Sequence, residues 1–269
     1  MDSGSDRFIA APALGRHRTV TVTEPTLPIR IWSIEAADGC NVKINEIYFS
    51  IQGEGKLVGV PSIFIRTSGC NLRCTWCDTP YTSWNPEGET QTIDEILERT
   101  RTLACRHIVL TGGEPMIASE VGELTRRLKR EDYHVTIETA GTVWQEVSCD
   151  LASISPKLSN STPVDREDGR WADRHEAARI NVDVIRRLMS LGDYQLKFVI
   201  DKASDLAEVD ELLLQVGNYD SNNVLLMPQG ITAKELTAKK LWLVELCKDR
   251  GFRYCPRLHI ELFGATRGT

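Results

Sequence analysis

The chain has 269 residues, of which 41% are hydrophobic and 26% are charged, and its formal net charge is −6. This composition is typical of one barrel-sized globular domain or two small ones, and no apolar run approaches the length of a membrane span. The most basic stretch, residues 126–130, lies beside acidic residues on a predicted helix, which indicates a solvated face and disfavours nucleic-acid binding. Eight cysteines without a secretory signal at the start of the chain predict a reducing, cytoplasmic location.

Residues 1–43 differ from the remainder, because prolines, threonines and arginines are scattered through them without a sustained period. Residues 20–23 are compatible with a short strand, but we expect the whole segment to be a flexible N-terminal extension. The folded domain is then expected to span residues 44–269.

Strands and helices alternate along this expected domain. Strands are predicted at 62–67, 107–111, 134–138, 151–154, 195–200, 223–227 and 253–258, and helices at 92–105, 119–130, 176–189, 204–216 and 232–251. Residues 92–95 and 232–235 both read as capping boxes, Ser204 is a predicted N-cap, and Gly251 is a predicted left-handed helix stop. The alternation implies a parallel sheet with right-handed crossovers, and the number of units favours an open, partial (β/α)6 barrel in the α/β class.

Polar motifs follow the predicted strands at their carboxyl ends. In chain order they are the loop at 68–78, Thr111-Gly112-Gly113-Glu114, Glu138-Thr139-Ala140-Gly141, Ser155-Pro156-Lys157, Met227-Pro228-Gln229-Gly230 and His259. Functional groups of β/α barrels gather at this end of the strands. We therefore expect a single site that collects all of these motifs.

Cys70, Cys74 and Cys77 form a C-x3-C-x2-C pattern, so one short loop can place three thiolates around a metal centre. Thiolates bind iron–sulfur clusters, and an all-sulfur set also suits zinc. A structural zinc site closes its shell with a fourth protein ligand, whereas three local ligands leave a position open, as in a catalytic centre. Three ordinary core cysteines are disfavoured at this density. The other five cysteines are expected to be small buried hydrophobes.

Together with residues 111–115, Thr-Gly-Gly-Glu-Pro, the cysteine pattern resembles the radical S-adenosylmethionine (SAM) superfamily. The resemblance implies a [4Fe-4S] cluster held by three cysteines, with SAM bound to the fourth iron. Gly112 and Gly113 would allow close backbone approach to a ligand, and Glu114 could accept hydrogen bonds from the amino group of SAM. A plain strand-end turn is the alternative reading of these residues. Trp76 is expected to cover the cluster and the adenine.

A second set of motifs resembles the 7-carboxy-7-deazaguanine synthase family over about residues 44–269. The motifs lie at 45–55, 59–62, 64–66, 77–79, 155–157 and 258–261. The family converts 6-carboxy-5,6,7,8-tetrahydropterin into 7-carboxy-7-deazaguanine and ammonia on the route to queuosine. The resemblance implies that the reduced cluster splits SAM and that the resulting 5′-deoxyadenosyl radical takes a hydrogen from C6 of the pterin. The substrate radical then contracts its ring and takes the hydrogen back, so SAM is regenerated.

The resemblance also implies residue roles, with the chemistry carried by cluster and SAM rather than by a catalytic side chain. Cys70, Cys74 and Cys77 would bind the cluster, and Thr79 would offer a hydroxyl to a Mg²⁺ that also touches substrate. The implied SAM contacts are Trp76, Cys77, Asp78, Gly113, Glu114, Ser155, Pro156, Lys157, Met227 and Gln229. The implied substrate contacts are Ile51, Gln52, Gly53, Arg66, Thr111 and His259.

Three of the polar side chains also have alternative interpretations. The planar fork of Arg66 matches the substrate carboxylate, but a surface salt bridge would suit the same residue. Glu138 is the polar residue at the end of an apolar strand. A buried carboxylate whose hydrogen bonds are all made within the protein is an equally good interpretation of it. His259 agrees with a histidine that the family places near substrate, whereas most histidines in such a position are packed or at the surface.

Two segments depart from the family pattern. Some family members contact substrate through a terminal carboxylate, but here residues 263–269 run on, so that contact is not expected. Trp171 and the charged stretch 165–174 replace an expected helix and are interpreted as a lid or a dimer contact.

The expected partners are the small pterin substrate, a flavodoxin-type electron donor and a second copy of the chain in a homodimer. A radical SAM activase that places a glycyl radical on a partner protein is an alternative enzyme, although it has no need for the Gln-Gly-Glu-Gly segment at 52–55. A zinc or redox module built on the three cysteines is the non-enzymatic alternative.

Overall fold

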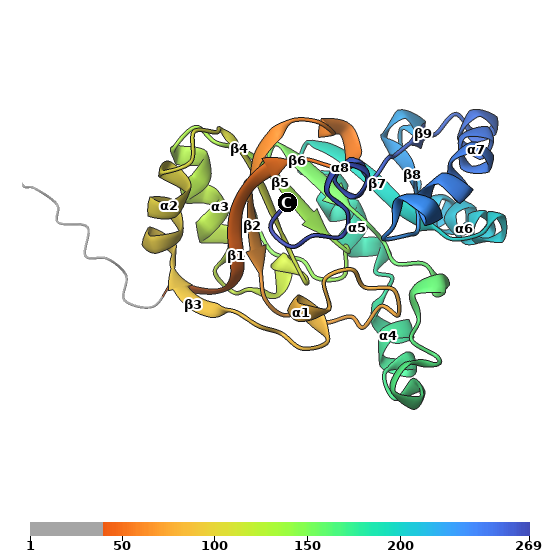
Figure 1. Cartoon of the computed structure of the whole chain (residues 1–269), viewed down its shortest axis with the longest axis horizontal. Coiled ribbons are helices and arrows are strands. Elements are labelled where there is room, and N and C mark those ends of the chain that lie inside the picture. Colours follow the sequence, from red (N-terminus) through yellow and green to blue (C-terminus); the bar gives the residue numbers. More distant parts are fainter. Residues whose placement is uncertain (1–39) are drawn as a thin grey trace, which may run out of the picture. The chain divides into compact units, whose positions relative to one another are not determined.

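The computed structural model describes residues 40–269 (Figure 1). The strand predicted at 20–23 and nearly all of the extension predicted at 1–43 lie outside the described residues. The first described strand, β1 (Asn41–Ile51), begins before residue 44, so the folded part starts earlier than predicted. Among residues 40–269, no helix is long and apolar enough to cross a bilayer.

One mixed sheet organises the described residues, with the strand order β3-β1-β2-β4-β5-β6-β7-β8-β9. Its other strands are β2 (Pro61–Thr67), β3 (Glu89–Thr92), β4 (His107–Gly112), β5 (His134–Thr139), β6 (Leu151–Ile154), β7 (Asp193–Ile200), β8 (Val224–Pro228) and β9 (Arg253–Tyr254). Every neighbouring pair from β2 to β9 is parallel, whereas β1 is antiparallel to both β2 and β3. The parallel series confirms the predicted partial barrel.

The two edges of the sheet differ from the prediction. Strands β1 and β3 were not predicted, and most of the motif at 45–55 lies in β1. The last predicted strand, 253–258, is wrong beyond Tyr254, because the chain passes through Pro256, which has no amide hydrogen to donate to a sheet. Helix α8 (Leu258–Phe263) follows directly.

The helices cover the strands, and α2 (Ile93–Arg101) and α7 (Ala233–Arg250) begin where local capping predicts. The others are α1 (Pro80–Ser83), α3 (Val121–Arg130), α4 (Ala172–Ala178), α5 (Val182–Met189), α6 (Leu206–Val216) and α8. Both predicted capping boxes are confirmed: at α2, Thr92 Oγ1 accepts from the Glu95 amide at 3.2 Å while Glu95 accepts from the Thr92 amide at 2.7 Å. Gly251 ends α7 with a φ of 65°, as predicted.

Two helix predictions are wrong in detail. The helix predicted at 176–189 is two helices, α4 and α5, because Asn181 caps a new start by accepting from the Val184 amide at 3.2 Å. Ser204 does not cap α6, because it lies within the 3-10 turn Ala203–Asp205 and the α-helix begins at Leu206.

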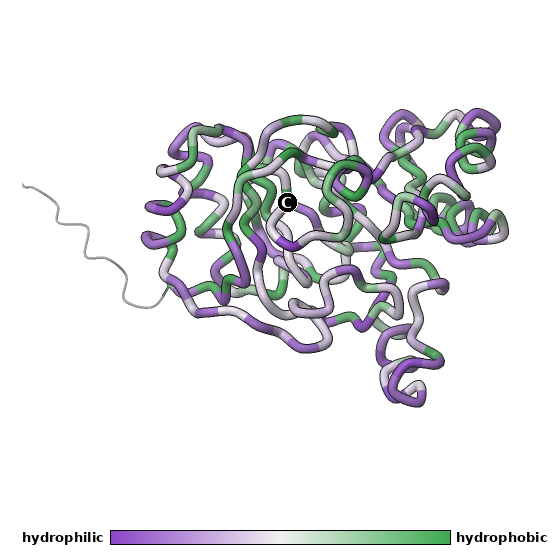
Figure 2. Tube along the Cα trace, in the orientation of Figure 1, coloured by the Kyte–Doolittle hydropathy of each residue, from purple (hydrophilic) through white to green (hydrophobic). Residues whose placement is uncertain are grey.

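Strand alternation separates the apolar core from the interior of the barrel. On β7, Leu196, Phe198 and Ile200 belong to the hydrophobic core that the strands form with the helices. Lys197 and Val199 point to the opposite face and line a cavity. Figure 2 shows the corresponding mixture of hydrophobic and hydrophilic residues, with hydrophilic residues predominating around α4. The barrel interior can therefore hold polar groups without interrupting the core.

The five cysteines outside the 68–78 loop are only partly as predicted. Cys247 and Cys255 are buried, whereas Cys40, Cys105 and Cys149 are half-buried. Cys105 lies in the turn before β4, where its thiol donates to the Pro61 carbonyl at 3.1 Å and the residue packs against the edge of the core.

Candidate active site

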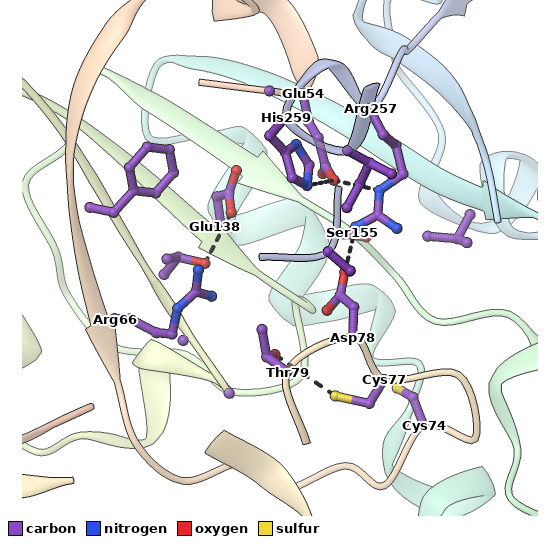
Figure 3. A pocket seen from close by; sticks show the side chains of 18 of the residues that line it. Glu54, Arg66, Cys74, Cys77, Asp78, Thr79, Glu138, Ser155, Arg257 and His259 are labelled. Carbon is purple, nitrogen blue, oxygen red and sulfur yellow. Dashed lines mark hydrogen bonds and ion pairs between the residues drawn. The ribbon is translucent and has the colours of Figure 1, made fainter. Parts of the chain in front are cut away.

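A cavity of about 290 Å³ lies at the carboxyl ends of the parallel strands (Figure 3). Its walls come from the ends of β2 and β4 to β8, from β1, from the cysteine loop (residues 68–78) and from the C-terminal tail (residues 264–269). The motifs that follow the predicted strands therefore do meet at one place.

Almost all residues with an implied role line this cavity. They are Ile51, Gln52, Gly53, Arg66, Cys70, Cys74, Trp76, Cys77, Asp78, Thr79, Thr111, Gly113, Ser155, Lys157, Met227, Gln229 and His259. Glu114 and Pro156 are not part of the lining. The individual ligand contacts stay predictions, since lining a cavity does not identify what a side chain binds.

The cysteine loop presents an all-sulfur set of donors to the cavity. Cys74 is buried, Cys70 and Cys77 are half-buried, and Cys77 Sγ lies 3.2 Å from Ser83 Oγ. Burial raises the pKa of the Cys70 and Cys74 thiols to about 12, so a bound metal would be needed to keep thiolates there. Within residues 40–269, no three His, Cys, Asp or Glu side chains are gathered into a metal site. The composition of the loop nevertheless fits an iron–sulfur cluster, because its three thiols face no competing imidazole and its one carboxylate, Asp78, is paired with Arg257.

The glycines after β4 serve the cysteine loop rather than a ligand alone, which corrects the prediction for Gly112 and Gly113. A Cβ on Gly113 would lie 2.1 Å from the Gly69 carbonyl oxygen, and one on Gly112 would lie 2.3 Å from that of Thr67. The Glu114 amide donates to the Gly69 carbonyl at 2.9 Å. Bare backbone is therefore required for the β4 end to support the start of the cysteine loop.

The carboxylate of Glu114 forms hydrogen bonds within the protein and does not line the cavity, while its predicted contact with SAM stays a prediction. It is fully buried and accepts from Thr139 Oγ1 at 2.7 Å, the Ala140 amide at 2.8 Å and the Met116 amide at 3.1 Å. Burial raises the pKa of Glu114 in spite of these three hydrogen bonds. The hydrogen bonds from Thr139 and Ala140 to Glu114 fix the turn after β5.

Trp76 packs where a cover for a bound cofactor would be expected. It packs against the small buried cluster that contains Cys74 and also against the cluster that Val199 and Met227 form on β7 and β8. Its indole nitrogen donates to the Asn160 carbonyl at 2.9 Å. The ring therefore joins the cysteine loop to the far strands of the barrel.

The segment around α4 supports the cysteine loop from outside, a contact that the sequence analysis missed. The Arg73 amide donates to His175 Nδ1 at 3.1 Å, and His175 Nε2 lies 2.8 Å from Ser161 Oγ. Burial lowers the pKa of His175 to about 4, so its ring is neutral near pH 7. The guanidinium carbon of Arg166 lies 3.7 Å from the centroid of the Trp84 ring, so the two groups stack. Residues 165–174 were interpreted as a lid or a dimer contact, and in the structure this segment covers the outer side of the cysteine loop.

Polar groups converge on Glu138 at the opposite side of the cavity. Gln52 Nε2 donates to Glu138 Oε1 at 3.1 Å, and Thr111 Oγ1 donates to Glu138 Oε2 at 3.0 Å. Lys197 Nζ lies 3.9 Å from the same carboxylate. Glu138 is thus a charged acceptor inside the barrel, with neutral donors that a ligand could replace.

Arg66 is already partly engaged by protein groups. Its Nε donates to Glu46 Oε1 at 2.7 Å and its Nη2 donates to Tyr48 Oη at 2.7 Å, while its side chain is 14% exposed. Among the residues that the structure describes, Nη1 has no hydrogen-bond partner. A carboxylate in the cavity can therefore reach Nη1 directly, whereas Nε already donates to Glu46 and Nη2 already donates to Tyr48.

A buried charge network stands beside Glu138. Glu54 pairs with Lys197 and with Arg257, and His259 Nε2 lies 3.9 Å from its carboxylate. Burial alone would raise the pKa of Glu54, but Lys197 and Arg257 outweigh burial and lower it. These groups hold compensating charges in a place where isolated ions would be costly.

His259 lies on α8 and not at the end of a strand. The ring packs against Gly53 so closely that a Cβ on this glycine would meet His259 Nδ1 at 1.9 Å. Burial lowers the pKa of His259. The packed interpretation of this histidine is correct, and its position on the cavity wall is correct as well.

The C-terminal tail lines the cavity, while the expectation that its terminal carboxylate does not contact substrate stays a prediction. Arg267 anchors it: Nη2 donates to Asn45 Oδ1 at 2.9 Å, Nη1 donates to Glu87 Oε2 at 3.0 Å, and the guanidinium lies 4.3 Å from the Tyr81 ring centroid. The tail is held across the β1 side of the cavity.

Comparison with known proteins agrees with this site. Residues 64–159 match the model of the Radical SAM superfamily. The chain is 46% identical over 234 residues to the 7-carboxy-7-deazaguanine synthase of Rhodopirellula baltica, covering 87% of this chain and 91% of that protein. It is 44% identical over 236 residues to the synthase of the same name from Halobacterium salinarum, covering 84% and 92%. The chain belongs to the 7-carboxy-7-deazaguanine synthase family.

The crystal structure of QueE from Escherichia coli shares the fold, with a TM-score of 0.64 and 24% identity over 82% of this chain and 96% of that chain. Membership of the synthase family decides between the alternatives left open by the sequence. The glycyl-radical activase and the zinc or redox module are not supported, because the similarity to the synthases extends across most of the chain.

Three charged residues of this synthase-family cavity were missed as site residues by the sequence analysis. Glu54 was noted only within the Gln-Gly-Glu-Gly segment, and Lys197 only within a predicted strand. A lysine flanked by Leu196 and Phe198 is a usable signal, because strand alternation places it on the other face. Arg257 carries no such signal, because the turn before α8 was not predicted.

Proposed function

We propose that this chain is a radical SAM enzyme that converts 6-carboxy-5,6,7,8-tetrahydropterin into 7-carboxy-7-deazaguanine and ammonia, a step in queuosine biosynthesis. The observation that carries the proposal is one cavity with thiols on one wall and a polar, charge-compensated set on the other. Family membership over most of the chain supports the same reaction.

We propose that Cys70, Cys74 and Cys77 hold the [4Fe-4S] cluster and that SAM binds beside it. When bound, the pair would supply the one-electron chemistry that removes a hydrogen atom from the substrate. The chain's own residues bind and cover it: Trp76 shields one side, and Ser155 and Lys157, whose Nζ donates to Ser155 Oγ at 2.8 Å, form a polar edge. Further SAM contacts are proposed for Asp78, Gly113, Met227 and Gln229.

The pterin is proposed to lie against the polar wall. Its amino and ring N–H groups would donate to Glu138, displacing Gln52 and Thr111 from a carboxylate that they now hold in place. The substrate carboxylate would accept hydrogen bonds from Arg66. Ile51, Gly53 and His259 would lie along the remaining edge of the pterin. The displaced Gln52 amide and Thr111 hydroxyl would then donate to acceptors of the pterin, so that they are not left buried without a partner.

A Mg²⁺ ion is proposed at Thr79, since its hydroxyl faces the cavity between the cysteine loop and the polar wall. A single hydroxyl together with substrate oxygens and water suits a hard cation that keeps part of its hydration shell. Thr79 Oγ1 lies 3.9 Å from Cys77 Sγ, so the ion would stand next to the cluster-bearing loop.

A flavodoxin-type protein is proposed as the electron donor, because the reaction needs a one-electron reductant. A homodimer, a cytoplasmic location and a flexible extension at 1–43 stay predictions of the sequence.

The test is anaerobic reconstitution with iron and sulfide, followed by incubation with SAM, dithionite and the carboxylated tetrahydropterin. We expect a product with the mass of 7-carboxy-7-deazaguanine, together with released ammonia. A preparation that carries a four-iron cluster and cleaves SAM, but leaves the pterin unchanged, would contradict the proposal.

A further inference from the structure

Arg257 joins the two walls of the cavity. Only 7% of this residue is exposed. Its Nε donates to Glu54 Oε1 at 3.0 Å, its Nη1 donates to the Gly230 carbonyl at 2.6 Å, and its Nη2 donates to Asp78 Oδ2. Figure 3 shows the guanidinium between Glu54 and Asp78.

The three acceptors belong to three loops with different proposed tasks. Glu54 follows Gln52 on the substrate side of the cavity, and Asp78 directly follows a cysteine of the cluster set. Gly230 ends the loop after β8 that is proposed to touch SAM. A single side chain therefore fixes the loop for substrate to both loops for SAM.

Only a guanidinium can satisfy this arrangement. Its planar fork directs N–H groups to three sides at once. A lysine, by contrast, carries all of its N–H donors on a single nitrogen. The Asp78 side chain is 42% exposed and the Glu54 side chain is 12% exposed. Asp78 is thus open to a ligand on one side while Arg257 holds it on the other.

We infer that Arg257 is a positioning residue that couples SAM binding to substrate binding, an inference that rests on the proposed function. A ligand that fixes Asp78 also fixes the guanidinium, which in turn fixes Glu54 and the loop that faces the substrate. The second ligand then meets a wall that is already ordered and binds more tightly. Such coupling is reciprocal, so each ligand changes the affinity for the other by the same factor.

The test measures equilibrium binding of labelled SAM to the reconstituted enzyme with its cluster oxidised, so that no turnover occurs. For the unaltered enzyme we expect saturating 6-carboxytetrahydropterin to tighten SAM binding by about 10-fold, and SAM to tighten pterin binding by the same factor. In R257M and in R257K the two factors should fall towards one. Because R257K keeps the positive charge, its loss of coupling would separate the geometry of the fork from its charge.

A spectroscopic readout accompanies the binding data. The electron paramagnetic resonance signal of the reduced cluster with SAM should change when pterin is added to the unaltered enzyme, and should not change in R257K. The control is R186M, which removes an arginine that binds the Gln215 and Val216 carbonyls away from the cavity. This control should keep the coupling factor of the unaltered enzyme.

The inference is overturned if the unaltered enzyme binds both ligands without mutual effect, or if folded R257K keeps the full coupling factor. If R257M does not fold, the coupling factor of R257K alone decides the test. An unaltered, cluster-loaded enzyme that binds neither SAM nor pterin overturns the proposed function itself, and the inference with it.

Discussion

The two walls of the cavity are assembled in opposite ways. On the cysteine wall, the three thiols come from one loop, and their spacing along the chain already determines what they can bind. On the polar wall, Glu54, Glu138 and Lys197 come from the loop after β1 and from two distant strands, and they meet only because the barrel brings them together. Local spacing therefore reveals the cofactor, whereas the substrate side depends on the tertiary fold.

The largest effect is expected on the cysteine wall. Cys74→Ser should abolish product formation and SAM cleavage, because an oxygen in place of one sulfur leaves the cluster with two cysteine ligands. Iron and sulfide per chain after anaerobic reconstitution measure the loss.

Cys105→Ser is the matched control, since Cys105 lies in a half-buried turn outside the cavity lining and should leave the iron content unchanged. Full iron content and activity in C74S would contradict the conclusion that the cysteine wall holds the cluster.

Breaking the polar wall should leave the cluster in place. Lys197→Met removes the cation next to Glu54 and Glu138, so one buried carboxylate loses part of its compensation and the free energy of unfolding should fall by about 3 kcal/mol. Product formation should be lost while iron content and SAM cleavage persist. Urea unfolding, iron analysis and 5′-deoxyadenosine assays measure the three quantities.

Lys248→Met is the control for this substitution, because Lys248 pairs with Glu245 on an exposed surface. Should K197M lose its iron together with its product, the two walls would not be independent.

The outer support of the cysteine loop should depend on pH. The folded pKa of His175, about 4, lies below its ordinary 6.5, so between these values the unfolded chain binds a proton that the folded protein does not. The free energy of unfolding therefore falls as the pH falls through this interval. The groups that face the ring are Arg73, Ser161, Glu176, Arg179 and Lys157.

His175→Asn keeps an oxygen that can accept from the Arg73 amide but removes the titration. Urea midpoints of H175N between pH 7 and pH 4 should depend less on pH than those of the unaltered protein. Equal losses in both proteins would assign the effect to other groups.

The smallest effect is expected at the C-terminal tail. Arg267 is 45% exposed in its side chain, and exposed ion pairs contribute at most about 1 kcal/mol. Arg267→Ala should therefore raise KM for the pterin by no more than about 5-fold and leave kcat unchanged. Steady-state kinetics test this, and a large fall in kcat would instead place the tail in the chemical step.

The parts of the fold that could be predicted are those with a local cause. The parallel strands, the capping boxes at Thr92 and Thr232 and the stop at Gly251 follow from periodicity and from hydrogen bonds between residues three or four apart. Strands β1 and β3 could not be predicted in this way, because their antiparallel pairing joins residues 45 to 51 positions apart, from Ile44–Glu89 to Asn41–Thr92.

The same distinction explains the site. The spacing of Cys70, Cys74 and Cys77 is legible in the chain, whereas the contact between Arg73 and His175 joins residues that are 102 positions apart. The hydrogen bonds of Glu114 within the protein were not predicted either, because a family motif names a residue without saying which way its side chain points. Its side chain turns to Thr139 and Ala140 beneath the neighbouring strand.

The tail has a practical consequence for work on the enzyme. Thr269 lies on the wall of the cavity, so a segment fused after it would start at the entrance of the proposed binding site. A purification handle or fluorescent protein attached there would obstruct that entrance, and a correctly folded preparation would then look inactive. Surface sites on α3 or α7 offer attachment points that leave the mouth clear.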